Sequence, residues 1–141
     1  MRRRGFTIIE LLIVMAVIAI LVSIGIPSFR AMQTEGWKTK ADRDTMALKI
    51  AVEAYYKNHG SFPAESGYQA TLLSETPPML ESTLDDPFAA AGTAYAYKLS
   101  TGGSYYVIYS IGPGGTGAMS IADTGNASAS AGSPIYSTNG W

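Results

Sequence analysis

The sequence contains no cysteine and one histidine, His59, and these two scarcities exclude several kinds of site. Without cysteine, disulfide bonds cannot hold the fold, and a cysteine nucleophile or a thiolate metal site is impossible. A hydrolytic site needs a nucleophile, a base and an orienting group, yet no serine lies in a recognisable nucleophile motif and His59 sits at a predicted helix end. We therefore expect that this chain is not an enzyme.

Charge is also scarce, because only 15% of the 141 residues are Asp, Glu, Lys or Arg and the net charge is −1. Three of the 10 basic residues, Arg2, Arg3 and Arg4, lie together at the amino terminus. The remainder of the chain is acidic on balance and offers no basic surface for nucleic acid. Nucleic acid is therefore not expected as a primary partner.

What the sequence does contain is a long apolar run from Leu11 to Ile26, followed by Pro27. A helix from Phe6 to Ile26 would be about 31 Å long, which matches a bilayer hydrocarbon core of about 30 Å. The three arginines ahead of the run predict that the amino terminus stays on the cytoplasmic side. Glu10 is anomalous, because a charge within such a segment costs about 2.5 to 3.5 kcal/mol and needs a partner.

The stretch Gly5-Phe6-Thr7-Ile8-Ile9-Glu10, followed by the apolar run and Pro27, resembles the amino-terminal signature of type IV pilin-like proteins. The resemblance implies that a prepilin peptidase cuts between Gly5 and Phe6 and that Phe6 becomes the N-methylated first residue. It also implies three regions. Residues 1–5 form a cleaved leader, residues 6–27 form the membrane-spanning and polymerisation half of a helix, and residues 28–141 form a periplasmic or extracellular globular domain.

Cleavage would create an ammonium group at Phe6, one helical turn from Glu10. If subunits stack with an axial stagger, the ammonium of one chain can meet Glu10 of another, so that correct assembly neutralises a costly charge. Pairing within one subunit and a Glu10 that reaches the lipid headgroups remain alternatives. An ordinary secretory signal cut after Gly25 is a further alternative, although it would have no use for Glu10.

After Pro27 the sequence predicts that the helix continues to Asn58, with Pro27 and Gly36 as tolerated kinks. His59 and Gly60 end it, since glycine readily adopts the left-handed conformation of a helix terminus. One apolar stripe is expected to cover a sheet. Its predicted members are Phe29, Met32, Ala47, Ile50, Ala51, Ala54 and Tyr55.

The second half of the chain predicts a small antiparallel sheet and therefore an α+β fold. Residues 64–84 form a loop with a short helix near 70–74. Tyr95 to Leu99 and Ser104 to Ile111 form a hairpin around Thr101-Gly102-Gly103, with its alternating aromatics buried on one face and exposed on the other. The Gly-, Ala- and Ser-rich tail from Gly112 is expected to be mobile or poorly packed, apart from a short strand at 135–137.

Two acidic features are candidates for chemistry. Asp85 and Asp86 precede Pro87, where a role in capping a turn is expected rather than acid–base catalysis. Major pseudopilins bind calcium in the loop after the last clear strand, and the resemblance makes calcium a possible ligand here. Gly114 stands where that family usually has Asp, however, so Asp123 is the one downstream carboxylate for such a site.

The resemblance is to the major pseudopilin of type II secretion in particular. The succession Asp-Pro-Phe, Tyr-x-Tyr and Ser-Ile-Gly-Pro-Gly-Gly in the second half is similar to that group, and many pilins have a carboxyl-terminal disulfide that this chain lacks. The implied pilin-like fold packs a long amino-terminal helix against the sheet. The implied partners are copies of the chain itself, minor pseudopilins, the prepilin peptidase and an assembly platform in the bacterial inner membrane. A type IV pilus subunit for adhesion, motility or DNA uptake and a monomeric membrane-anchored binding domain are the alternatives.

Overall fold

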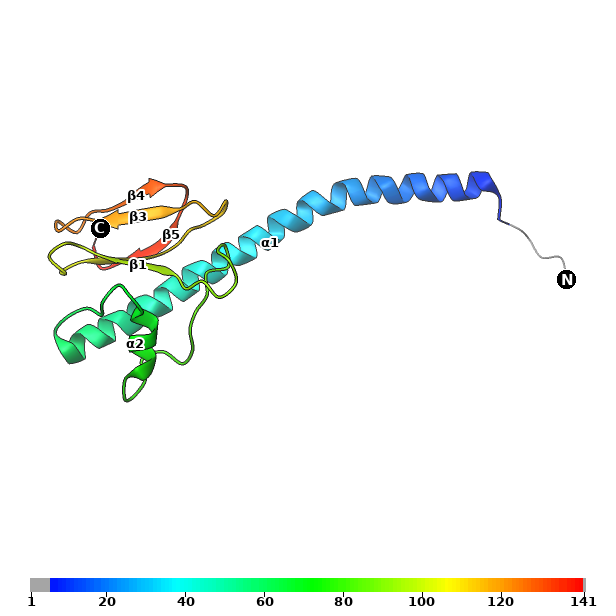
Figure 1. Ribbon diagram of the computed structural model, residues 1–141. Helices are drawn as coiled ribbons and strands as arrows, with labels where there is room; N and C mark the ends of the chain where they lie inside the picture. Colours follow the sequence, from blue (N-terminus) through cyan, green and yellow to red (C-terminus); the bar gives the residue numbers. More distant parts are fainter. Residues whose placement is uncertain (1–5, 141) are drawn as a thin grey trace. The chain divides into compact units, whose positions relative to one another are not determined.

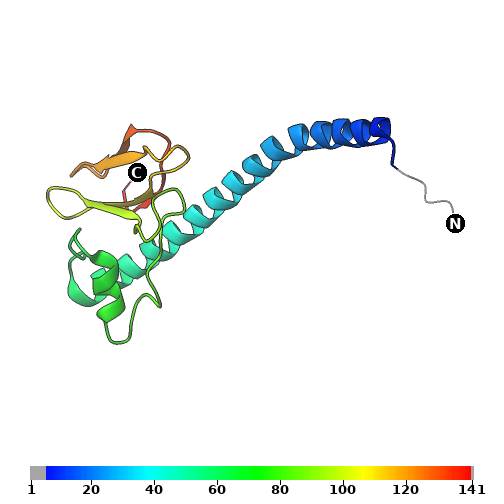
Figure 2. The same ribbon diagram turned by 45° about the vertical axis from the view of Figure 1, so that its right-hand side comes forward.

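The computed structural model describes residues 6–140, which form two helices and five strands (Figure 1, and from a second side in Figure 2). In chain order these elements are α1 (Ile8–His59), α2 (Tyr68–Ser74), β1 (Ala96–Leu99), β2 (Tyr106–Ser110), β3 (Ala118–Ile121), β4 (Ala127–Ala131) and β5 (Ile135–Thr138). The fold is α+β, with a long amino-terminal helix and small antiparallel sheets, as the sequence predicted.

Helix α1 begins and ends within two residues of its predicted bounds and runs through Pro27 and Gly36 without interruption. Thr7 precedes its first turn, and its last turn closes with a 2.7 Å hydrogen bond from the Gly60 N–H to the Tyr56 carbonyl oxygen. Gly60 has a φ of 72°, a left-handed conformation that residues with a Cβ rarely adopt. The prediction that His59 and Gly60 end the helix is confirmed.

The chain divides into two compact units, the first ending at Glu35 and the second beginning at Gly36. In the first unit α1 contains an apolar window with a mean hydropathy of 2.9, none of which is buried, and which is long and apolar enough to cross a membrane. Large apolar side chains such as Ile8, Leu21 and Ile24 are more than 60% exposed there. An apolar surface of this kind needs lipid or protein to cover it.

In the second unit, β1, β2 and β5 form a three-stranded antiparallel sheet with β2 in the centre. The predicted hairpin is confirmed, because β1 pairs with β2 in a register that places Leu99 opposite Tyr106. The predicted short strand near the carboxyl terminus is β5, which pairs with the other side of β2. Strands β3 and β4 form a separate antiparallel hairpin.

Both faces of β2 are buried, since all five of its residues are buried. Tyr106 and Ile108 pack with α1 and α2 in the main core, whose other buried members are Ala41, Leu48, Ala51, Val52, Tyr68, Leu72, Leu80, Tyr95 and Tyr97. Val107 and Tyr109 belong to a second cluster with Met119 and Ile121 of β3. The prediction of one exposed face was therefore wrong, because the hairpin β3–β4 covers it.

The predicted apolar stripe of α1 was largely wrong. The helix instead buries Ala41, Thr45, Leu48, Ala51 and Val52. Ile50 is 70% exposed and Met32 75% exposed, whereas Ala51 and the partly buried Tyr55 are the stripe members in or against the core. Thr45 lies on the buried face because Ser137 of β5 donates a hydrogen bond to its hydroxyl, so a polar residue occupies a position that hydrophobicity alone would reject.

The tail after Gly112 also differs from the prediction, because it contains β3 and β4 as well as the predicted strand β5. Close backbone approaches explain four of its glycines, Gly112, Gly117, Gly132 and Gly140. A Cβ on Gly140 would lie 2.0 Å from the Gly125 carbonyl oxygen, and one on Gly117 would lie 2.3 Å from the Ile111 carbonyl oxygen. Several glycines of a segment whose composition is typical of mobile chains are therefore required here by close backbone contacts.

Candidate functional site

Thr7 caps the first turn of α1 and contacts Glu10. The Thr7 hydroxyl accepts a hydrogen bond from the Glu10 backbone N–H (3.3 Å) and donates one to Glu10 Oε2 (3.5 Å). The Thr7 carbonyl oxygen accepts a further bond from the Leu11 N–H (3.2 Å). Thr7 was not among the predicted site residues, although threonine three residues before glutamate, ahead of an apolar run, is the sequence signal of a capping box.

Glu10 lies in the first turn of α1, where the helix dipole favours a negative charge. Phe6, immediately before the cap, is 75% exposed and Ile9 is 67% exposed, so the surface around the carboxylate is open in the single chain. Gly5 and the rest of the leader 1–5 lie outside the described residues. Cleavage between Gly5 and Phe6, N-methylation of Phe6 and the pairing of Phe6 with Glu10 therefore stay predictions.

Pro27 lies inside α1, where it supplies no N–H to the helical hydrogen-bond ladder. The Ser28 hydroxyl donates to the Ile24 carbonyl oxygen (3.4 Å) in the same turn. Gly25 has no atoms within 4 Å of where its Cβ would be, and together with Val22, Ile26, Phe29 and Arg30 it lines a shallow hollow of about 340 Å³. The helix surface near Pro27 is therefore indented and apolar.

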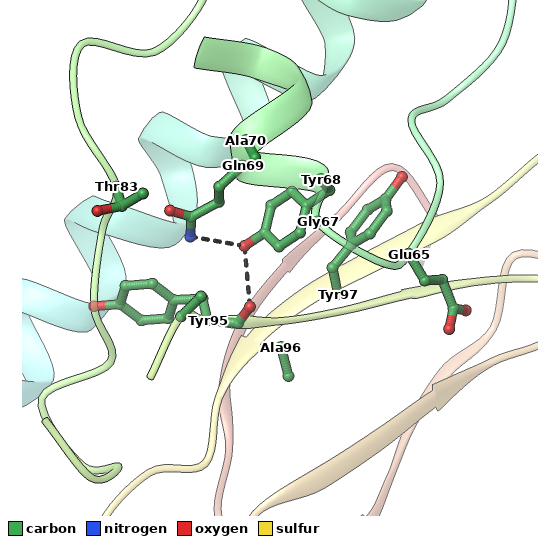
Figure 3. Close-up of a pocket in the computed structure, with 10 residues that line it drawn as sticks. Glu65, Gly67, Tyr68, Gln69, Ala70, Thr83, Tyr95, Ala96 and Tyr97 are labelled. Carbon is green, nitrogen blue, oxygen red and sulfur yellow. Dashed lines mark hydrogen bonds between the residues drawn. The ribbon is translucent and has the colours of Figure 1, made fainter. Parts of the chain in front are cut away.

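A set of convergent polar groups in the second unit lies beside β1, at a cavity of about 400 Å³ (Figure 3). The Tyr68 hydroxyl donates to the Tyr95 carbonyl oxygen (3.1 Å), and Gln69 Nε2 donates to the Tyr68 hydroxyl (3.1 Å). Gln69 also bridges to Leu84, accepting from its N–H at 2.8 Å and donating to its carbonyl oxygen at 3.0 Å. These groups satisfy one another, so the arrangement fastens α2 to the edge of β1.

No catalytic set is found among residues 6–140. Within them no group of three or more His, Asp or Glu side chains is close enough to hold a metal ion. His59 contacts Glu75 (3.5 Å) and stacks on Tyr55, with ring centroids 4.0 Å apart, but no nucleophile joins them. The contacts of His59 tie the end of α1 to the residue that follows α2.

The amino-terminal segment has recognisable relatives. Residues 1–26 match the family model of the prokaryotic N-terminal methylation motif. The chain is 26% identical to the type II secretion system core protein G of Escherichia coli K12 over 125 residues, which cover 88% of this chain and 82% of that protein. It is 30% identical to the type IV major pilin protein PilE1 of Neisseria gonorrhoeae over 100 residues, 71% of this chain and 60% of that pilin.

The chain is type IV pilin-like. It is also 37% identical over 70 residues to the type IV major pilin protein PilA of Myxococcus xanthus, which covers 32% of that pilin. The pilin-like chain spans 60% of the length of the gonococcal pilin PilE1 and 38% of the length of two fimbrial proteins of Neisseria meningitidis. No solved structure is a significant match to it. The relatives are named as a major pilin and as a core protein of a secretion system, and neither name is that of an enzyme.

Asp123, the predicted calcium ligand, lies in the turn between β3 and β4 of the pilin-like chain. Its Oδ1 accepts a 2.6 Å hydrogen bond from the Gly102 N–H and so joins this turn to the turn of the β1–β2 hairpin. Calcium takes six to eight oxygen ligands, and one exposed carboxylate that already holds a backbone N–H fits such a site poorly. The calcium site stays a prediction, and a rise in the melting temperature when calcium replaces a chelator would support it.

Asp86 has a larger structural role than the turn cap that the sequence predicted. Its side chain is 4% exposed, and its Oδ1 accepts hydrogen bonds from the Phe88 N–H (2.9 Å) and the Ser110 hydroxyl (2.7 Å). Its Oδ2 accepts from the Ile111 N–H (2.8 Å). The predicted cap on the turn at Pro87 is therefore present, and the same carboxylate also holds the end of β2.

Tyr97 provides a test of the main core of the pilin-like protein. Its hydroxyl is buried and, within the described part of the chain, has no hydrogen-bond partner. We expect Tyr97→Phe to raise the free energy of unfolding by about 1 kcal/mol, because a buried unpaired polar group is costly. Tyr106→Phe is the matched control, since the Tyr106 hydroxyl donates to Glu53 (3.1 Å) and its loss should cost about 1 kcal/mol. Equal destabilisation of both variants in urea unfolding of the detergent-solubilised protein would contradict this account.

The buried tyrosines also predict sensitivity to alkali. Burial raises the pKa of Tyr68 to about 12. Burial is also the largest cause that raises the pKa values of Tyr95, Tyr97 and Tyr106, and nearby acidic groups and tyrosines raise them further. Because the unfolded value is about 10, the stability from these groups is fully present below pH 10 and is lost as pH rises through the folded values. We expect cooperative unfolding above about pH 10, with tyrosinate absorbance and far-UV circular dichroism changing together.

A matched variant separates this effect from general alkaline damage. Tyr68→Phe should move the onset of unfolding to higher pH, whereas Tyr136→Phe, at an exposed site, should not. Tyrosinate absorbance that develops fully while the circular dichroism stays native would show that the buried phenols ionise without unfolding, contrary to the prediction.

Proposed function

We propose that this pilin-like chain is the major pseudopilin of a type II protein secretion system. The observation that carries the proposal is the extent of its similarity to core protein G, which covers 88% of this chain and 82% of that protein. The fimbrial relatives from Neisseria meningitidis match over 64 residues and 38% of their own length. The absence of cysteine also favours a pseudopilin over pilins that carry a carboxyl-terminal disulfide.

In this proposal the precursor is held in the bacterial inner membrane by residues 6–27, with the amino terminus in the cytoplasm. The apolar window of α1 is unburied in the single chain, so it is covered by lipid before assembly and by the helices of other copies afterwards. After cleavage by a prepilin peptidase, the ammonium of Phe6 would meet Glu10 of a neighbouring subunit and set the axial stagger. The indented surface at Gly25 and Phe29 would admit side chains of that neighbour. An inner-membrane assembly platform and minor pseudopilins would be the other partners.

A deletion of the gene in the source bacterium, complemented with the full chain, tests the function. We expect the deletion to abolish export of folded proteins into the medium while surface pili and motility persist. Loss of surface pili and motility with normal protein export would identify a type IV pilus subunit. The 30% identity to the gonococcal pilin makes this the second candidate. If neither phenotype changes and the chain remains monomeric in the membrane, it is an anchored binding domain.

Processing is tested separately by the mass of the amino-terminal peptide. We expect a peptide that begins at Phe6 and carries one added methyl group. A chain that retains Met1, or one cut after Gly25, would contradict the prepilin assignment, whereas a methylated Phe6 with normal secretion would leave the processing intact and overturn only the pseudopilin role.

A further inference from the structure

Asn139 is followed in the sequence by Gly140, whereas the other two asparagines, Asn58 and Asn126, are followed by residues with a side chain. Asparagine is thermolabile, because the backbone nitrogen of the next residue can attack its side-chain amide. A glycine has no side chain to hinder that nitrogen, and its backbone is free to bring the nitrogen to the amide carbon. We therefore expect Asn139 to be the asparagine most prone to this attack.

Both ends of the Asn139 side chain are bound near the start of β2. Its Oδ1 accepts a hydrogen bond from the Tyr106 N–H (2.8 Å), and its Nδ2 donates to the Ser104 carbonyl oxygen (3.2 Å). The side-chain amide bonds to β2 as the backbone of a further strand residue would, one step beyond the pairing of β5 with β2 that ends at Thr138. The amide that would react is therefore part of the structure that closes the sheet.

The attacking group, the Gly140 N–H, is bound as well. It donates to the Thr138 hydroxyl oxygen (2.9 Å), and that hydroxyl donates in turn to the Tyr106 carbonyl oxygen. The Gly140 backbone also lies against the Gly125 carbonyl, at a place where a Cβ would not fit. The bonds of the Asn139 side chain and of the Gly140 N–H, here called the Asn139 clasp, keep the nitrogen and the amide carbon engaged with other partners.

From these contacts we propose that Asn139 is a deamidation site that the fold protects, so that the reaction takes place in chains whose Asn139 clasp has opened. In the open chain the Gly140 nitrogen attacks Asn139 Cγ, the bond from Cγ to Nδ2 breaks, and ammonia leaves with the Gly140 proton. The product is a five-membered cyclic imide. Water then opens the imide at one of its two carbonyl groups to give aspartate or isoaspartate, so that solvent is the only other reactant.

The product cannot re-form the whole clasp. A carboxylate has no N–H to donate to the Ser104 carbonyl oxygen, and it places a negative charge beside that oxygen. Isoaspartate also adds a methylene group to the main chain just before Gly140, where the backbone fits closely against the Gly125 carbonyl. A transient opening between β2 and β5 thus becomes permanent, and the chain carries a chemical record of it. The proposal does not depend on the secretion function.

The rate of deamidation tests the protection. The full-length protein in detergent is kept at mildly alkaline pH with and without guanidinium chloride, and the mass of the peptide that contains Asn139 is followed. We expect ammonia loss to be at least about tenfold slower without denaturant, because the reaction then waits for local opening. Equal rates at Asn139 in the two conditions would overturn the proposal.

Ala127→Gly supplies a matched reference in the same molecule, because it places a glycine after Asn126. Asn126 is exposed, and within the described part of the chain its side chain has no hydrogen-bond partner. Its deamidation in this variant should therefore proceed at similar rates with and without denaturant. A reaction that denaturant accelerates equally at Asn126 and Asn139 would mean that the clasp is not what protects Asn139.

Thr138→Val and Thr138→Ser test the bond to the Gly140 N–H. Valine removes the acceptor and should raise the rate at Asn139 without denaturant about fivefold, whereas serine keeps the hydroxyl and should react like the wild type. The deamidated wild-type protein, separated from its parent by its extra negative charge, should have the lower melting temperature. Equal rates in the two variants, or a deamidated protein that melts like its parent, would contradict the proposal.

Discussion

Replacement of Glu10 by alanine or glutamine should leave membrane insertion and processing intact and lower the yield of assembled filament by about tenfold or more. Alanine removes the one charge in the apolar segment, so insertion becomes easier. Assembly becomes harder, because the Phe6 ammonium of a neighbouring chain would be buried without a partner, at a cost of about 3 to 5 kcal/mol for each subunit.

The two Glu10 variants distinguish the effect of the Glu10 charge on assembly from the effect of Glu10 on the capping of α1. Glutamine retains a side-chain oxygen that can accept from the Thr7 hydroxyl, which contacts Glu10 Oε2 in the wild type, but it carries no charge. If the charge sets the register, both variants fail. If capping of α1 is what matters, Glu10→Gln assembles normally and only Glu10→Ala fails.

Filament is measured by shearing and sedimentation, insertion by carbonate extraction of membranes, and cleavage by the mass of the amino-terminal peptide. Asp42→Asn is a suitable control, since Asp42 is an exposed acid on α1 outside the apolar run. Wild-type yields of filament from both Glu10 variants would exclude the pairing with Phe6.

Replacement of Asp86 by alanine should lower the free energy of unfolding by about 3 to 5 kcal/mol, the largest loss that we expect from a single change in the second unit. The substitution leaves the N–H groups of Phe88 and Ile111 and the hydroxyl of Ser110 without their acceptor. Each such buried donor costs about 1 to 3 kcal/mol, and the losses overlap because the three groups share one site.

Asp85→Ala is the matched control, because Asp85 is the adjacent acid but is exposed. It should change stability by less than about 0.5 kcal/mol, as surface substitutions usually do. Trp37 packs edge-on against Phe88, with ring centroids 5.9 Å apart, so tryptophan fluorescence in urea reports on this region directly. A similar loss in both variants would mean that the turn before Pro87, and not the buried carboxylate, is what stabilises the domain.

The long helix and the β1–β2 hairpin could be predicted because their signals are local. The apolar run, the helix-ending glycine and two β-rich segments around Gly102-Gly103 each lie within a few consecutive residues. The buried face of α1 could not be predicted in the same way. Thr45 is inside and Ile50 outside because of where β5 lies, and β5 is about 90 residues further along the chain.

The hairpin β3–β4 was missed for a related reason. Its strands are short, and β4 contains only alanine and serine, which have no strong preference for strands. Its formation depends on burial of Met119 and Ile121 against Val107 and Tyr109, a contact that appears only when β2 is in place. Asp86 was assigned to a turn on similar grounds, because its bonds to Ser110 and Ile111 connect residues far apart in sequence.

In the second unit, α1 is joined to the rest of the domain by a row of polar side chains. Lys40 bonds to the Asp85 carbonyl oxygen, Asp44 to Tyr95, Thr45 to Ser137, Lys49 to the Thr138 carbonyl oxygen and Glu53 to Tyr106. Most of these positions are four residues apart, so they lie along one side of the helix.

A rotation of α1 about its own axis by about 100°, the angle between successive residues of an α-helix, would break all of these bonds together. Helix and sheet must therefore rotate as one rigid piece from Lys40 to Glu53. A twist applied to residues 40–53 of α1 therefore reaches the rest of the domain through several hydrogen bonds that share the load. Mechanical work done on this part of the helix would move the sheet together with it.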